Sequence, residues 1–174
     1  MRLQTNTSRK ARILSVSAAL GVGVALAVGS AVAQQNQNFD NVQIDTVKVR
    51  DDVYMLVGAG GNTTIFTGPE GILVVDTQFA PLSTKLLAAI RAISDGPIRY
   101  IVSTHLHGDH IGGNEAISKA GRFRAGGNVV GDLGAAATAT AKIIAHENVL
   151  TRLSAEPAPG QTAVPFGAWA TERY

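Results

Sequence analysis

Three of the four histidines in this chain lie within six positions, in the run His105-Leu106-His107-Gly108-Asp109-His110. Side chains in an extended segment alternate sides, so His105 and His107 are predicted to point the same way and to hold one metal ion. Gly108 is expected to let the backbone turn, so that Asp109 and His110 can face a second position nearby. We interpret the run as the start of a two-metal cradle, and we call residues 105–110 the metal loop.

Four other interpretations fit this run less well. A single histidine is more often a structural residue than a ligand, but here three of them surround an aspartate. A His-x-His at a strand end also resembles the amidohydrolase barrels, which need about 250 residues, whereas this chain has 174. The chain has no cysteine and no His-Glu-x-x-His pattern, which argues against a zinc finger and a zincin. The residues therefore favour the two-metal interpretation.

The elements that must position the metal loop are predicted to be alternating strands and helices. Strands are expected over residues 45–50, 53–57, 63–67, 72–75 and 98–103, and an amphipathic helix over residues 81–94. The last of these strands ends at the metal loop, and chemistry in α/β folds gathers at the carboxyl ends of strands. Gly112-Gly113 is expected to let the next helix approach closely. The fold class predicted from this pattern is α/β.

A glycine-rich segment, residues 58–62, lies between two of the predicted strands. It lacks the Lys-Ser/Thr of a phosphate-binding loop, and a strand-like stretch follows it instead of a helix. We interpret it as a hairpin connection.

The net charge of +2 and the basic pI come from the N-terminus. Four basic residues and no acidic one precede residue 13, and without these four the chain has 11 basic against 13 acidic side chains. The sequence therefore gives no electrostatic reason to expect a nucleic-acid partner. The length is that of one domain, and a small molecule is the expected substrate.

Residues 1–33 have the three parts of a signal peptide. A basic segment is followed by the apolar run 13–29 and by Ala31-Val32-Ala33, a small-x-small cleavage site ahead of Gln34. We expect Sec export and a periplasmic or secreted protein, with no membrane attachment after cleavage. The alternative is an uncleaved signal anchor, although the apolar run is shorter than the ~20 residues of a spanning helix. Residues 34–43 are expected to be a polar tether.

The stretch from Thr104 to Asn114 resembles the signature of the metallo-β-lactamase superfamily, and the strand ending Val74-Val75-Asp76-Thr77 resembles the strand that precedes it there. The resemblance covers about residues 45–150. It implies an αββα sandwich with metals between the sheet edges, of which only the N-terminal half is apparent here. It also implies that His105 and His107 bind the first metal, that Asp109 and His110 bind the second, and that Asp76 orients ligands without binding the metal.

The resemblance further implies a zinc-dependent hydrolase with two Zn²⁺ ions in a complete protein. In such an enzyme a metal-bound hydroxide attacks an ester, thioester, lactone or β-lactam. Asp109 is the residue expected to orient the attacking water, and so to be catalytic. Export favours a β-lactam or lactone over a cytosolic thioester.

The C-terminal part of the chain departs from the family pattern. Further ligands are expected there, yet no His or Cys follows His146. His146 is predicted to be a structural residue within a helix over residues 134–153. We expect a partial domain over residues 44–155, a connector over 156–174, and a chain that is a fragment of an exported hydrolase. The alternative is a non-catalytic metal-binding remnant or a half-domain that depends on a partner.

Overall fold

The computed structural model describes residues 38–123 and 140–174. The predicted signal peptide lies outside the described residues. Within them, no helix has the length and apolar character needed to cross a membrane.

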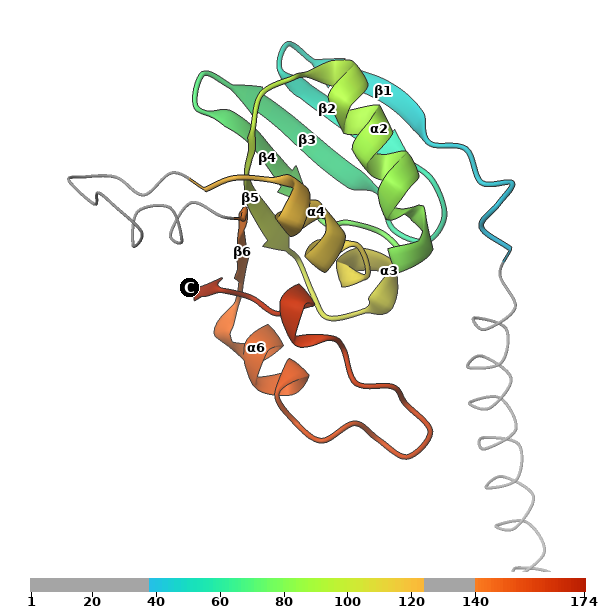
Figure 1. Ribbon diagram of the computed structural model, residues 1–174, viewed down its shortest axis with the longest axis vertical. Helices are drawn as coiled ribbons and strands as arrows, with labels where there is room; N and C mark the ends of the chain where they lie inside the picture. Colours follow the sequence, from blue (N-terminus) through green and yellow to red (C-terminus); the bar gives the residue numbers. More distant parts are fainter. Residues whose placement is uncertain (1–37, 124–139) are drawn as a thin grey trace, which may run out of the picture. The chain divides into compact units, whose positions relative to one another are not determined.

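One mixed sheet forms the body of the described structure (Figure 1). Its order follows the chain, and the pairs are antiparallel from β1 to β4 and parallel from β4 to β7. The strands are β1 (Asp45–Arg50), β2 (Val53–Val57), β3 (Thr63–Gly68), β4 (Gly71–Val75), β5 (Ile98–Ser103), β6 (Lys142–Ala145) and β7 (Glu172–Arg173). The predicted strands up to residue 103 are confirmed, with shifts of one residue at β3 and β4.

Helices cover one face of this sheet (Figure 1). The short 3-10 helix η1 (Ala80–Leu82) leads into α2 (Ser83–Ile93), which is followed after β5 by α3 (Gly108–Ile111) and α4 (Asn114–Ala120). Leu86 and Ile90 of α2 are fully buried against Ile65, Val74 and Ile101 of the sheet. Burying a side chain of this size stabilises the fold by about 1.5–3 kcal/mol. The predicted amphipathic helix is therefore confirmed.

The opposite face of the sheet is also apolar but carries no helix among the described residues. Phe66 on this face is 45% exposed, and its cross-strand partners are Val53 and Leu73. Met55 and Val75 flank Thr64 in the next row, and they are half-buried. A sheet with helices on one face and a bare apolar second face is half of the predicted sandwich.

The helix predicted over residues 134–153 is wrong in its central part. Residues 142–145 form β6, which pairs in parallel with β5, and only Glu147–Leu153 is helical, as α6. Ile143 and Ala145 are buried and alternate with half-buried neighbours, as in a strand. Residues 134–139 lie outside the described part.

The C-terminal segment folds back onto the domain. The 3-10 helix η2 (Phe166–Ala168) packs on α4, and β7 pairs with β6. Ala168 is only 3% exposed, and the Thr171 amide donates to the Ile143 carbonyl oxygen at 2.8 Å. The end of the stretch expected to be a connector therefore completes the sheet edge.

Candidate metal centre

The metal loop begins where β5 ends, beside the end of β4. The Asp76 amide donates to the Val102 carbonyl oxygen at 2.9 Å, which fixes the two strand ends to each other. The chain bends at residues 104–106 after β5, so the extended backbone predicted from His105 to His107 is found only at His107, with φ of −68° and ψ of 144°. The one-turn helix α3 then carries Asp109 and His110. The parallel pairing of β4 and β5 thus brings Asp76 to the loop from a position remote in sequence.

Asp76 is a buried hydrogen-bonding centre under the loop, with an exposed fraction of 5%. Its Oδ1 accepts from the Thr104 amide at 2.8 Å, and its Oδ2 accepts from Thr104 Oγ1 at 2.7 Å and lies 2.7 Å from His110 Nδ1. Its backbone is left-handed, with φ of 59°. This conformation is uncommon for non-glycine residues and is best tolerated by Asp and Asn. The strained backbone aims the carboxylate at the loop.

These bonds orient two imidazoles. The Thr104 hydroxyl gives its proton to Asp76, so its oxygen can accept from His105 Nδ1, which lies 3.0 Å away. His110 donates its Nδ1–H directly to Asp76. This network assigns the proton to Nδ1 in both rings and leaves both Nε2 atoms without a proton, as metal binding requires.

The remaining distances fit two neighbouring ion positions. His105 Nε2 lies 3.2 Å from His107 Nδ1, and His110 Nε2 lies 3.6 Å from Asp109 Oδ2. Two tetrahedral zinc ligands with bonds of 2.0–2.1 Å are about 3.3 Å apart. Each pair could therefore share one ion. The ligand roles themselves stay a prediction.

Asp76, His105 and His110 also form a cluster whose ligand atoms lie within 4.8 Å of one another. The cluster alone would allow Asp76 to be a ligand. Its carboxylate is buried and already accepts from two donors of Thr104 and one of His110. We favour the orienting role, because a ligand role would give up part of this network.

The glycine-rich turn lies directly on the metal loop, which the sequence does not indicate. The turn connects β2 and β3, so the predicted hairpin connection is confirmed. A Cβ on Gly61 would lie 2.7 Å from His110 Cε1, and one on Gly60 would lie 2.5 Å from Asp109 Cβ. Only glycine allows this approach. The only trace of this contact in the sequence is the high number of glycines in residues 58–62. A tight turn alone would explain these glycines, so the sequence does not reveal the contact.

The glycines in and after the metal loop behave only partly as predicted. A Cβ on Gly113 would lie 2.5 Å from the Thr77 carbonyl oxygen, so the predicted close approach is confirmed. At Gly108 a Cβ would meet nothing within 4 Å, and its φ is not positive. The backbone turns there as predicted, because α3 begins, but neither a close contact nor a left-handed conformation requires glycine at this position.

His146 lies outside the metal cluster and caps α6. Its Nδ1 accepts from the Asn148 amide at 3.1 Å, and its ring packs edge-on against Tyr174 with centroids 5.6 Å apart. These contacts agree with the predicted structural role, although at a helix start and not inside a helix.

Comparison with known proteins identifies the family. The model of the metallo-β-lactamase superfamily matches residues 56–164. A linear primary-alkylsulfatase of a Pseudomonas species is 46% identical over 59 residues, which are 33% of this chain and 11% of that protein. An alkyl/aryl-sulfatase of Saccharomyces cerevisiae is 29% identical over 111 residues, which are 62% of this chain and 17% of that protein. The chain therefore spans a small part of these two sulfatases.

A solved structure shows the same fold. The metallo-β-lactamase from Pontibacter korlensis is 17% identical, with a TM-score of 0.50 over 76% of this chain and 53% of that one. Such a likeness concerns the fold alone, and it agrees with half of an αββα sandwich. The family resemblance seen in the metal loop is thus confirmed, and the chain belongs to the metallo-β-lactamase superfamily.

Proposed function

We propose that this chain carries the N-terminal half of the active site of an exported zinc-dependent hydrolase, and that its substrate class is the sulfate esters. The observation that carries the proposal is the hydrogen bonding of Asp76, which leaves the Nε2 atoms of His105 and His110 without a proton. A zinc-binding histidine usually donates its other N–H to an oxygen acceptor, and here the acceptors are the Asp76 carboxylate for His110 and the Thr104 hydroxyl for His105.

The donor set supports zinc over magnesium or calcium. The candidate ligands are three imidazoles and one carboxylate, whereas magnesium and calcium prefer oxygen ligands throughout. His105 and His107 would hold one ion, and Asp109 and His110 would hold the other. Zinc bound there would acidify a water molecule and polarise the bond to be cleaved.

Asp109 is the proposed catalytic residue. Its side chain is 26% exposed, and its Oδ2 is close to His110 Nε2. A partly exposed carboxylate at this position can accept a hydrogen bond from a water molecule and so hold it toward the substrate. The turn at Gly60 packs on the Cβ of Asp109 and limits the movement of its side chain.

Sulfate esters are favoured by the two sulfatase relatives, one of which acts on linear primary alkyl sulfates by its name. Organic esters, thioesters, lactones and β-lactams are the alternatives, because membership of the superfamily alone does not separate them. Export would bring the enzyme to substrates outside the cytoplasm.

The test uses the full chain with p-nitrophenyl sulfate, p-nitrophenyl acetate and a chromogenic cephalosporin, each with zinc and after chelation. Chelator-sensitive release of p-nitrophenol from the sulfate, lost in Asp109→Asn, is the expected result. If the chain hydrolyses another of these substrates faster, the class of that substrate would replace the sulfate esters in the proposal. Tight zinc binding with no turnover would reject hydrolysis by this chain.

A second candidate is a metal-binding protein without turnover. Each ion position receives two ligands from the described residues, fewer than the three protein ligands of a catalytic zinc site. The same measurements distinguish it, since it predicts zinc binding but no hydrolysis.

A further inference from the structure

Asn114 starts helix α4 directly behind the metal loop, and it is only 1% exposed. Its Oδ1 accepts from Thr77 Oγ1 at 2.9 Å, and its Nδ2 donates to Ser103 Oγ and to the Ala168 carbonyl oxygen, both at 3.0 Å. A carbonyl oxygen can only accept, so the bond to Ala168 fixes the orientation of the amide. Three segments that are far apart in sequence therefore meet at one buried side chain.

Two of these partners hold the metal loop itself. The Thr77 amide donates to the His110 carbonyl oxygen at 2.7 Å, so Thr77 fixes the backbone at the end of the loop. Ser103 precedes Thr104, whose side chain bonds Asp76 and lies against His105. Asn114 is thus linked to both ends of the metal loop through residues that are not themselves candidate ligands.

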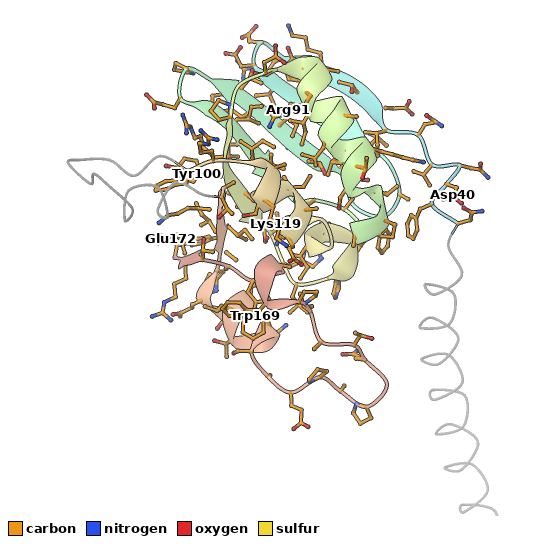
Figure 2. All side chains as sticks on the ribbon, viewed as in Figure 1. Asp40, Arg91, Tyr100, Lys119, Trp169 and Glu172 are labelled. Atoms are coloured by element: carbon orange, nitrogen blue, oxygen red, sulfur yellow. The ribbon has the colours of Figure 1, made fainter. Side chains whose placement is uncertain are left out.

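The third partner belongs to the C-terminal segment, residues 164–171. This segment rests on α4, where a Cβ on Gly167 would lie 2.7 Å from Glu115 Cδ. Glu115 in turn pairs at 2.6 Å with Lys119, an exposed residue of α4 that is labelled in Figure 2. Trp169, also labelled in Figure 2, donates to the Val164 carbonyl oxygen at 2.9 Å and so closes the segment on itself. Through the Ala168 carbonyl, the segment is hydrogen-bonded to the amide behind the loop.

We propose that Asn114 is a positioning residue that couples the docking of the C-terminal segment to the geometry of the metal loop. The inference rests on the proposed function in taking the loop as a zinc site. If the segment leaves, a buried amide N–H loses its acceptor, and the amide must turn or open to find another partner. Turning the amide withdraws Oδ1 from Thr77, which holds His110.

The test compares Asn114→Ala with Ser118→Ala in the full chain. Ser118 lies one turn later on the same face of α4, is 6% exposed, and donates to the Ala141 carbonyl oxygen at 2.7 Å. It is a matched buried hydrogen bond whose acceptor lies away from the metal loop. The zinc dissociation constant, measured by competition with a chromophoric chelator, should rise about tenfold in Asn114→Ala and stay within about threefold in Ser118→Ala.

A second readout separates coupling from a purely structural role. Coupling is reciprocal, so zinc should slow hydrogen exchange at the Thr171 amide, which reports docking of the segment. This zinc effect should disappear in Asn114→Ala and persist in Ser118→Ala. Equal zinc affinities in the two variants, or a zinc effect on Thr171 that survives in Asn114→Ala, would overturn the proposal.

Two further results keep the outcome decisive. Should Asn114→Ala not fold, Ser103→Ala removes one acceptor of the same amide and should give a smaller change in the same direction. No change in zinc affinity or in Thr171 exchange would then overturn the coupling.

Failure of the unaltered chain to bind zinc would refute the proposed function instead. The exchange rate of the Thr77 amide would still test the coupling, because it should rise in Asn114→Ala more than in Ser118→Ala.

Discussion

His110 Nδ1 lies 2.7 Å from Asp76 Oδ2, although the two residues are 34 positions apart in the sequence. The parallel pairing of β4 with β5 creates this contact, and the left-handed backbone of Asp76 directs the carboxylate to it. Since the same carboxylate accepts from the Thr104 hydroxyl, one buried group determines the direction of two imidazoles.

Asp76→Asn should weaken zinc binding by about 10–100-fold, the usual effect of removing a group that orients a ligand. Asparagine tolerates a left-handed backbone, so the strand end should keep its shape. Chelator competition measures the affinity. Asp95→Asn, at an exposed position before β5, is the control and should leave the affinity unchanged. An unaltered affinity in Asp76→Asn would remove the orienting role.

His110→Ala and His146→Ala should separate the metal loop from the helix cap. Loss of His110 should reduce zinc affinity by tenfold or more, because a candidate ligand is lost and Asp76 Oδ2 keeps only the Thr104 hydroxyl as a donor. Loss of His146 should lower the free energy of unfolding by about 1 kcal/mol, the usual value of a cap, with unchanged zinc affinity. Zinc titration measures the affinity of both variants, and urea unfolding measures their stability. Weaker zinc binding in His146→Ala with unchanged binding in His110→Ala would contradict the assignment.

Gly61→Ala should disturb the metal loop through space. Its Cβ would lie 2.7 Å from His110 Cε1, so either the imidazole or the turn must move. We expect weaker zinc binding. Gly108→Ala is the matched control, since a Cβ there meets nothing within 4 Å. It should raise stability by up to about 1 kcal/mol, as expected for removing a helical glycine. Similar zinc affinities in the two variants would show that the glycine-rich turn moves and the His110 imidazole stays in place.

Leu86→Ala should lower the free energy of unfolding by about 2–5 kcal/mol, because it opens a cavity between α2 and the sheet. Leu86 is fully buried, whereas Thr84 on the same helix is exposed. Thr84→Ala should change the stability by less than about 0.5 kcal/mol. Urea unfolding measures both, and a loss below about 1 kcal/mol in Leu86→Ala would contradict the description of the core.

The sequence predicts the parts of the fold that depend on local periodicity. Alternation and turn residues locate the strands up to Ser103, and the spacing of Leu82, Leu86 and Ile90 locates α2. The error at residues 142–145 has a tertiary cause. The short apolar run Ile143-Ile144-Ala145, close to Val149 and Leu150, is typical of a helix by its composition, but pairing with the edge of β5 makes it a strand.

The candidate site likewise has a part that local sequence predicts and a part that depends on tertiary contacts. Residue types and spacing within six positions single out the metal loop. Contacts across the fold cannot be read from one sequence, and they supply Thr104, Gly61 and Asn114. Asp76 comes from the resemblance of its strand to the family, and its hydrogen bonds agree with the implied role.

The metal loop is a contiguous segment, which affects how zinc and folding are linked. His105, His107, Asp109 and His110 stay near one another even when the sheet is lost, so an unfolded chain can still chelate the ion. A ligand stabilises a fold only by its preference for the folded over the unfolded chain. That preference depends here on Asp76, which joins the loop only after β4 and β5 have paired. Zinc should therefore protect this protein from unfolding less than its affinity alone suggests.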